Sequence, residues 1–323
     1  MGHLGEKKNI VINGKLLNYL LRQGHQVTAI HRGIGYKSSA RLKPYIELNT
    51  RLRSQTTVDF ERDIFKLMNN AVFGKTMEDV RKYSNFYLVR TEKWSKTVNR
   101  PDFKTSRAFG KYVSGVFRHK TEVQLNKPIY VGASVLDLSK LHMFHLHYDV
   151  VKAHFKNRAE LLMTDTDSLV YEITSPDLTA DLWQIREHFD FSNLPRDHPL
   201  YDASKKDQVG LLKDEFKGQR VLEFVGLRSK MYSVLDENRK TTAKAKGIPK
   251  SVTKRELPHQ LYKDALFAQQ PCSLTFHQIV STNHIVEVKQ QTKKALNAYD
   301  DKRYICDDGI TTLAYGHYSL CND

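Results

Sequence analysis

Two carboxylates one residue apart, Asp165 and Asp167, are the residues of this sequence best suited to chemistry. They belong to the polar run 165–168, which lies between two short apolar segments, 161–163 and 169–173. Such a pattern predicts a β-hairpin with polar residues at its tip. Neighbouring carboxylates repel one another unless a proton or a cation offsets their charge, and oxygen ligands of this kind suit Mg²⁺. An ordinary solvated turn fits the same residues, because Asp and Ser are common in turns.

A second candidate group lies on a helix predicted over most of 42–79. Two cations, an amide, an aromatic ring and a glycine follow one another at helical spacing and could hold a triphosphate and a base. A solvated basic face is the ordinary alternative for an amphipathic helix. The group consists of Arg62, Lys66, Asn70, Phe73 and Gly74. A separate apolar stripe predicts the buried side of the same helix, and it consists of Phe60, Ile64, Leu67, Met68 and Val72.

The charge balance indicates a polyanionic partner. The chain of 323 residues carries a formal net charge of +15, and nucleic acid is the commonest partner of such a basic protein. The segment 81–120 has eleven Lys and Arg against two acids, with eight aromatic residues interleaved. The segment 239–263 has eight Lys and Arg against Glu256. Cations among aromatic rings are typical of surfaces that follow a nucleic-acid strand, although many of these rings must belong to a core.

The composition predicts a folded protein in a reducing compartment. Apolar residues make up 40% of the chain and aromatic residues 10%, which is typical of a folded domain. The three cysteines, Cys272, Cys306 and Cys321, are few and widely spaced, and they match no metal site. No apolar run approaches the length of a membrane span, and the N-terminus lacks a signal-peptide core. We therefore expect an intracellular protein with no membrane partner.

Periodicity predicts the remaining elements. The clearest helix is 134–155, with Ser134 expected to cap its N-terminus. His142 and His145 on this helix could serve a metal, but packed or surface histidines are expected because no Cys or HExxH pattern accompanies them. Further helices are predicted at 182–189 and 257–267, and strands at 209–216, 221–235 and 271–288.

Taken in order, three motifs resemble those of family B DNA polymerases of the protein-primed branch. This branch includes viral, organellar, linear-plasmid and self-synthesising transposon (Polinton/Maverick-like) enzymes. The segment 66–74, Lys-Leu-Met-Asn-Asn-Ala-Val-Phe-Gly, is similar to the fingers motif K-x-x-x-N-S-x-Y-G. Thr-Asp-Thr-Asp-Ser at 164–168 is similar to the second palm motif without its leading Tyr, and Lys-Met-Tyr at 230–232 is similar to K-x-Y. The resemblance covers about Ile30 to the C-terminus and includes 300–304 and 307–312, which are similar to a transposon-type tail.

The resemblance implies a role for each matching residue. Asp165 and Asp167 would be the catalytic carboxylates of a site for two divalent ions, Mg²⁺ or Mn²⁺, with Asp167 a direct metal ligand. The helical group would bind the incoming nucleotide, through Arg62, Lys66, Asn70, Phe73 and Gly74. The primer end and duplex phosphates would be held by Lys230, Tyr232, Lys244 and Lys246.

The fold implied by the resemblance is α+β, a right-hand polymerase with fingers helices, an antiparallel palm sheet and a thumb. Residues 1–40 are expected to be an N-terminal remnant. The resemblance places the fingers at 41–82, a basic connector or palm insertion at 83–133, and the palm with the Asp-Thr-Asp hairpin and the Lys-x-Tyr motif at 134–250. It places the thumb and C-terminal tail at 251–323.

The departures from the family pattern concern metal binding. The first palm motif, D-x-x-S-L-Y-P, supplies another metal-binding aspartate in the family, but nothing from Met1 to Asp59 matches it. The 3′–5′ exonuclease domain is missing as well. We therefore expect a fragment of a DNA-directed DNA polymerase that is inactive alone. The alternative is a non-catalytic DNA-binding remnant of a mobile-element polymerase, and a metal nuclease is disfavoured because no further carboxylate cluster accompanies the two aspartates.

The expected partners are primer–template DNA and deoxynucleoside triphosphates, with a terminal protein primer as a further candidate. No oligomer is indicated. The basic segment 244–255 suits either a nuclear localisation signal or a loop that contacts duplex DNA, so nuclear and cytoplasmic residence both stay open.

Overall fold

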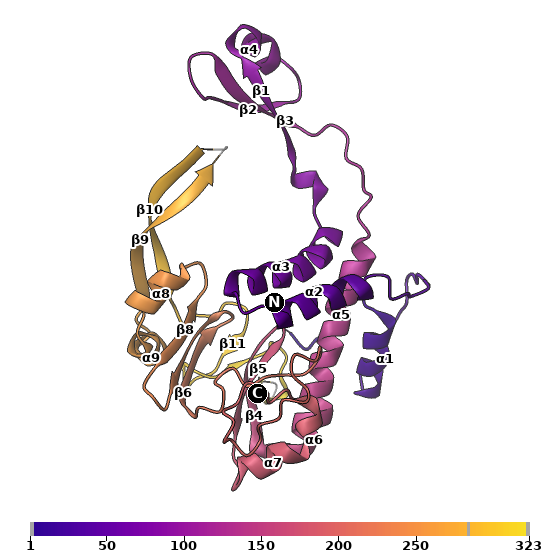
Figure 1. Ribbon diagram of the computed structural model, residues 1–323, viewed down its shortest axis with the longest axis vertical. Coiled ribbons are helices and arrows are strands. Elements are labelled where there is room, and N and C mark those ends of the chain that lie inside the picture. The colour runs from indigo at the N-terminus through magenta and orange to yellow at the C-terminus, as the bar shows by residue number, and fades with distance from the viewer. Residues whose placement is uncertain (1–2, 283–284, 321–323) are drawn as a thin grey trace. The chain divides into compact units, whose positions relative to one another are not determined.

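The computed structural model describes residues 3–282 and 285–320 and has a mixed α+β architecture with antiparallel sheets (Figure 1). The chain divides into an N-terminal unit, Ile12–Leu138, and a C-terminal unit, Ser139–Asp323 together with Met1–Val11. Each unit is described by itself. The boundary falls inside a helix, a few residues after the predicted start of the palm at residue 134.

Three helices open the N-terminal unit: α1 (Gly14–Arg22), α2 (Lys43–Gln55) and α3 (Asp59–Thr76). Asn13 caps α1 by accepting a hydrogen bond from the backbone N–H of Lys15. The predicted helix over 42–79 is broken into α2 and α3, because the backbone is extended at Thr56 and again at Val58. β-Branched residues favour this extended conformation. Acidic residues in the first turn of α3 then stabilise its positive N-terminal end.

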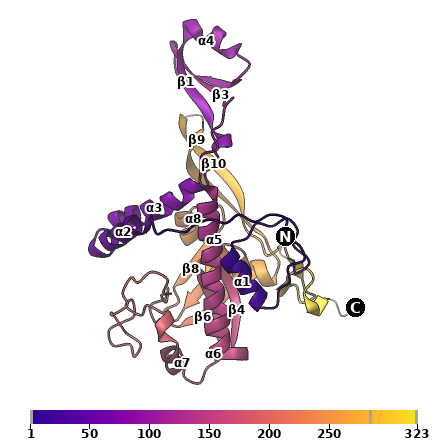
Figure 2. The same cartoon turned by 90° about the vertical axis from the view of Figure 1, so that its right-hand side faces the viewer.

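The predicted buried stripe of α3 is wrong. Phe60 is 73% exposed and Leu67 65% exposed, and α3 has no buried residue. The side of α3 that contacts α2 instead carries Asn69, whose Oδ1 accepts a hydrogen bond of 2.9 Å from Nδ2 of Asn49. Asn49 is only 2% exposed. A buried amide pair therefore joins the two helices, which lie side by side in Figure 1 and Figure 2.

A small sheet completes the N-terminal unit. It contains β1 (Ser84–Arg90), β2 (Phe103–Ala108) and β3 (Val113–His119) in the antiparallel order β1-β3-β2, with α4 (Thr91–Val98) packed on it. A short 3₁₀ turn, Val80–Lys82, leads into β1. Val116 at the centre of β3 is completely buried. The basic segment 81–120 is therefore a folded module and not an extended connector.

Glu78 ties both ends of this module to α3. Its carboxylate accepts hydrogen bonds from Lys75 in the last turn of α3 and from Tyr83 just before β1. Lys127, which follows the module, forms an ion pair of 3.1 Å with the same carboxylate. The Lys75 ammonium, followed by Tyr83 and Lys127, lowers the pKa of Glu78 to about 2. One carboxylate therefore anchors three segments that meet at the base of the module.

The long helix begins earlier than predicted. It runs through α5 (Ile129–Phe144), a π-helical stretch (His145–Lys152) and α6 (Ala153–Phe155), where the prediction was 134–155. Pro128 precedes its first residue, and proline is favoured at helix starts because it lacks an N–H. Ser134 is consequently inside the helix and not its cap; its hydroxyl lies 2.9 Å from the hydroxyl of Tyr36.

The C-terminal unit carries two antiparallel β structures in its first part. The hairpin β4 (Ala159–Asp165) and β5 (Ser168–Ile173) is followed by α7 (Leu178–Gln184) and a 3₁₀ turn, Arg186–His188. A separate sheet has the order β6-β7-β8, with β6 (Val221–Arg228), β7 (Met231–Asp236) and β8 (Thr241–Ala245). The strand predicted over 221–235 is thus two strands of a hairpin.

The main core of the C-terminal unit joins this sheet to the last helices and strands. The helices are α8 (Lys250–Glu256) and α9 (His259–Phe267), and the long hairpin, drawn in gold in Figure 2, is β9 (Cys272–Thr282) with β10 (Ile285–Leu296). Tyr262, Met231 and Leu296 are at most 1% exposed at its centre. The helix predicted at 257–267 and the strands at 271–288 are confirmed. Two short strands, β11 (Tyr304–Ile305) and β12 (Thr312–Leu313), and a 3₁₀ turn, Tyr318–Leu320, follow.

The strand predicted at 209–216 is wrong. Only Leu212 there pairs with another segment, through an isolated bridge to Phe189, and turns make up most of the rest. The completely buried carboxylate of Asp190 organises this region by accepting hydrogen bonds from the backbone N–H groups of Ser192 and Asp207, at 3.0 and 2.7 Å. These hydrogen bonds, together with one from Lys213, lower the pKa of Asp190 although burial opposes the shift. A side chain thus replaces a strand partner for these donors.

Candidate functional site

The two candidate catalytic carboxylates lie at the tip of the β4–β5 hairpin, as predicted. Asp165 and Ser168 pair across the hairpin, so Thr166 and Asp167 form its turn. The turn requires a positive φ of 57° at Thr166 and is closed by a hydrogen bond of 2.7 Å from the Asp167 N–H to the Asp165 carbonyl. Asp165 is half-buried, whereas the Asp167 side chain is exposed. The tip therefore presents a half-buried carboxylate, Asp165, and a solvent-exposed one, Asp167.

A lysine from a distant turn reaches Asp165. Lys230 lies in the turn between β6 and β7, with a φ of 60°, and its Nζ donates a hydrogen bond of 2.6 Å to Oδ1 of Asp165. This ion pair links residues that are 65 positions apart. The Lys230 ammonium lowers the pKa of Asp165, and the charge of Lys244 contributes in the same direction. The Asp-Thr-Asp and Lys-x-Tyr motifs are therefore brought together in the C-terminal unit.

Tyr232 and Lys244 lie side by side on adjacent strands of the same sheet. They are register partners of β7 and β8, and Nζ of Lys244 stands 5.5 Å from the centre of the Tyr232 ring. Tyr232 and the nearby charges of Asp165 and Glu215 raise the pKa of Lys244. Lys246 is exposed directly after β8. Four predicted residues, Asp165, Lys230, Tyr232 and Lys244, thus form one connected group.

Two members of this neighbourhood were missed by sequence reasoning. The ring of Phe224 on β6 lies 6.0 Å from that of Tyr232, and the carboxylate of Glu215 acts on Lys244. Neither belongs to a motif. Strand register places Phe224, and a loop places Glu215, so no sequence signal could have found them.

A polar chain fixes β7 from its other face. Ser233, next to Tyr232, places its Oγ 2.9 Å from Nδ1 of His259 on α9, and Nε2 of His259 lies 3.3 Å from a carboxylate oxygen of Glu223. Lys263 donates a hydrogen bond of 2.8 Å to the same oxygen. Ser233 is completely buried, so no substrate could reach its hydroxyl and this arrangement is no catalytic triad. It holds α9 against the strand that carries Tyr232.

The predicted nucleotide-binding residues are on α3, in the N-terminal unit. Lys66, Asn70 and Gly74 are exposed, and Phe73 is half-buried. Arg62 is also exposed, and its Nε donates a hydrogen bond of 3.0 Å to the Thr56 carbonyl in the break before α3. The predicted helical spacing is therefore present. The end of α3 is further fixed by Gly132 of α5, where a Cβ atom would lie 2.2 Å from the Met77 side chain.

The donors available for a metal can be compared with what Mg²⁺ requires. In the described parts of the chain, no group of three or more His, Cys, Asp or Glu side chains could hold a metal ion. Asp167 is an exposed oxygen donor of the kind that Mg²⁺ prefers, and Asp165 beside it is ion-paired with Lys230. A pair of bridged ions does not fit these two carboxylates. His142 and His145 are hydrogen-bonded elsewhere, to the Gly210 carbonyl at 2.7 Å and to Asp149 at 2.5 Å.

Comparisons with known proteins found no match. No family model matches the chain, and neither a curated protein nor a solved structure matches it. Among the helices of residues 3–282 and 285–320, none is both long and apolar enough to cross a membrane.

Proposed function

We propose that this chain is part of a DNA-directed DNA polymerase of the family B, protein-primed kind, with a palm-type site at the β4–β5 hairpin. The observation that carries the proposal is the hydrogen bond of 2.6 Å between Lys230 and Asp165. Asp-Thr-Asp and Lys-x-Tyr are common residue strings separately. A contact that joins them across 65 positions supports the interpretation that they serve one site.

The two hairpin carboxylates suit different roles because their environments differ. Asp167 is exposed and suits a hydrated Mg²⁺, whereas Asp165 is occupied by Lys230 and suits a positioning role. Bound Mg²⁺ would supply charge stabilisation for transfer of a nucleotidyl group to a primer 3′-hydroxyl. Lys230, Tyr232 and the cations Lys244 and Lys246 would hold the primer end and the adjacent phosphates.

The α3 face would contribute to nucleotide binding. Arg62 and Lys66 supply positive charge one turn apart, which suits a triphosphate. Asn70, Phe73 and Gly74 follow over the next two turns and could border the base pair.

Equilibrium binding tests the proposal without requiring turnover. The full chain is mixed with a labelled primer–template whose primer ends in a dideoxynucleotide, in Mg²⁺, with either the matching or a mismatched nucleotide. We expect the matching nucleotide alone to tighten binding, as measured by fluorescence anisotropy. Asp167→Asn and Lys66→Ala should each abolish this effect. Glu160→Gln on β4 and Lys43→Ala on α2 replace exposed residues of the same types and should leave it intact.

A second candidate function is DNA binding without catalysis. It is favoured by the small donor set at the hairpin, where the described residues offer two carboxylates and no larger cluster. In this case the chain would bind primer–template with strong salt dependence and no response to the matching nucleotide. That outcome would refute the polymerase proposal and keep the binding one.

A further inference from the structure

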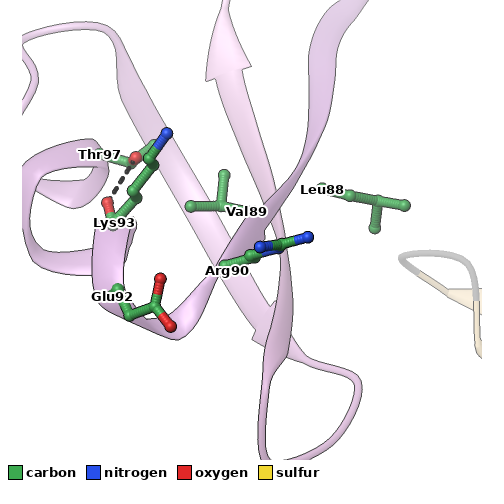
Figure 3. Close-up of a pocket in the computed structure, with 6 residues that line it drawn as sticks. All are labelled: Leu88, Val89, Arg90, Glu92, Lys93 and Thr97. Carbon is green, nitrogen blue, oxygen red and sulfur yellow. Dashed lines mark hydrogen bonds between the residues drawn. The ribbon is translucent and has the colours of Figure 1, made fainter.

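The sheet of the N-terminal unit has one face covered by α4 and one that α4 does not cover. Side chains alternate between the faces of a strand. Figure 3 shows Leu88 and Val89 of β1 on opposite sides of the strand, with Val89 directed toward Lys93 and Thr97 of α4 and Leu88 directed away. Val116 of β3, the register partner of Tyr87, lies on the same covered side as Val89 and is completely buried. We call the side that carries Leu88, which is 68% exposed, the open face.

Three phenylalanine rings cluster on the open face. Phe86 and Phe117 are register partners with ring centres 4.8 Å apart, and Phe109 meets Phe86 edge-on at 6.4 Å. Phe109 is 39% exposed, and the other two rings are half-buried. An aromatic cluster inside a core would be covered on all sides, so the partial exposure is informative.

Gly115 provides the floor under these rings. A Cβ atom at this position would lie 2.5 Å from Phe109 and 2.7 Å from Phe86, distances at which the rings would have to move. The rings therefore lie directly on the backbone of β3. This arrangement presents aromatic surface along the sheet.

The charges on the open face are all positive. Alternation places Arg90 of β1 and Arg107 of β2 on this side. Lys104 donates a hydrogen bond of 2.9 Å to Ser84, which lies on the same side of β1 as Phe86. Neither acid of the module occupies a strand position on the open face, although Glu92 lines one pocket with Leu88 and Arg90. Glu92 belongs to α4, and Asp102 accepts a hydrogen bond of 2.8 Å from Arg118, a residue of the covered side.

We propose that the open face of the β1-β3-β2 sheet is a binding platform for single-stranded nucleic acid. Unpaired bases would stack on the rings of Phe86, Phe109 and Phe117, and phosphates would meet the surrounding Arg and Lys side chains. A duplex keeps its base faces inside the stack and cannot use the rings in this way. The platform goes beyond the proposed nucleotidyl transfer, because it needs neither the hairpin carboxylates nor a metal.

The test compares two single strands and a duplex, which carry equal charge per phosphate, using the full chain and fluorescence anisotropy. The probes are fluorescein-labelled oligothymidylate of about 12 nucleotides, an abasic strand of the same length, and a duplex. We expect the oligothymidylate to bind about tenfold more tightly than the abasic strand, since base stacking separates them. Equal affinity for both single strands, or a duplex affinity that Phe109→Leu lowers as much as the oligothymidylate affinity, would overturn the proposal.

Variants then locate the platform. Phe109→Leu keeps an apolar side chain but removes the ring, and it should cut oligothymidylate affinity about tenfold while leaving abasic binding unchanged. Tyr87→Leu removes an exposed ring from the covered side and serves as the matched control. Arg107→Gln should weaken binding of both strands, whereas Lys93→Gln on α4 should have a smaller effect. An unchanged affinity in Phe109→Leu would contradict the assignment.

A second readout covers the case in which Phe109→Leu does not fold. Phe109→Trp keeps an aromatic ring, so it should retain binding, and its fluorescence should be quenched by oligothymidylate but not by the abasic strand. Absence of this difference would equally refute stacking at this position. Asp167→Asn should leave all of these values unchanged, so failure of the platform and failure of the proposed polymerase site are distinguishable. Oligouridylate in place of oligothymidylate separates RNA from DNA as the natural strand.

Discussion

The hairpin site and the α3 face are built in opposite ways. At the hairpin, Asp165 meets Lys230 from 65 positions away, and Tyr232 meets Lys244 across a strand pair. On α3, Lys66 and Asn70 are exposed and aligned by helical spacing, and the exposed Arg62 is hydrogen-bonded to the nearby Thr56 carbonyl before the helix. The hairpin group is therefore held in place before a ligand arrives, whereas the long side chains on α3 would lose conformational entropy on binding. The sheet therefore preorganises the hairpin group.

One apolar residue of each motif repeats this contrast. Met231, between Lys230 and Tyr232, is 1% exposed in the main core. Leu67, next to Lys66 on α3, is 65% exposed. The Lys-x-Tyr motif is therefore anchored in the core of its unit, whereas the α3 motif lies on the surface.

Met231→Ala should have the largest effect on stability. Removing a buried methionine side chain costs about 2–5 kcal/mol, whereas Leu67→Ala on an exposed helix position should stay within about 0.5 kcal/mol. The chain has two tryptophans, Trp94 in the N-terminal unit and Trp183 in the C-terminal unit, so single-tryptophan variants report each unit separately. Urea unfolding followed by fluorescence measures both. Comparable losses from the two substitutions would show that the motifs are not embedded differently.

Asn69→Ala tests whether the amide pair holds α2 to α3. It leaves the buried amide of Asn49 without its partner, at a cost of about 1–3 kcal/mol, and the Trp94 signal should record the loss. The double substitution Asn49→Leu and Asn69→Leu replaces both amides with apolar groups and should recover much of the stability. If the single and double variants are equally unstable, another contact joins the helices.

Lys230→Met should change the hairpin more in charge than in stability. Because Lys230 is largely exposed, the ion pair contributes at most about 1 kcal/mol. The pKa of Asp165 should rise toward its ordinary value once the ammonium is removed, as measured by carboxyl NMR titration. Lys250→Met on α8 is the control for loss of one positive charge. A pKa of Asp165 that does not move would mean that Lys230 is not its partner in solution.

These contrasts also show what the sequence could and could not predict. The hairpin at 165–168 was predictable because a polar tip between two apolar runs is a local pattern. Its contact with Lys230 was not, since it depends on how two separate hairpins pack. The buried side of α3 was predicted wrongly because Phe60 and Leu67 are apolar but exposed, and the contact with α2 is made by an amide. At 209–216, where strand-like residues predicted a strand, the chain forms a loop that Lys213 ties to the buried Asp190 carboxylate.

Acid should weaken the two units through different carboxylates, and this is the smallest effect we expect. The pKa of Glu78 in the N-terminal unit is about 2, held there first by Lys75, and that of Asp181 in the C-terminal unit is also about 2, held first by Arg158. Both values lie below those of the unfolded chain, so each carboxylate stabilises its unit above the ordinary carboxyl range of about pH 4. This contribution is lost as the pH falls toward 2. Glu78→Gln should therefore flatten the acid dependence of the unfolding midpoint read by Trp94 and leave that read by Trp183 unchanged, and Asp181→Asn should do the reverse. If either substitution alters both signals equally, the two units do not unfold separately and their stabilities must be treated as one.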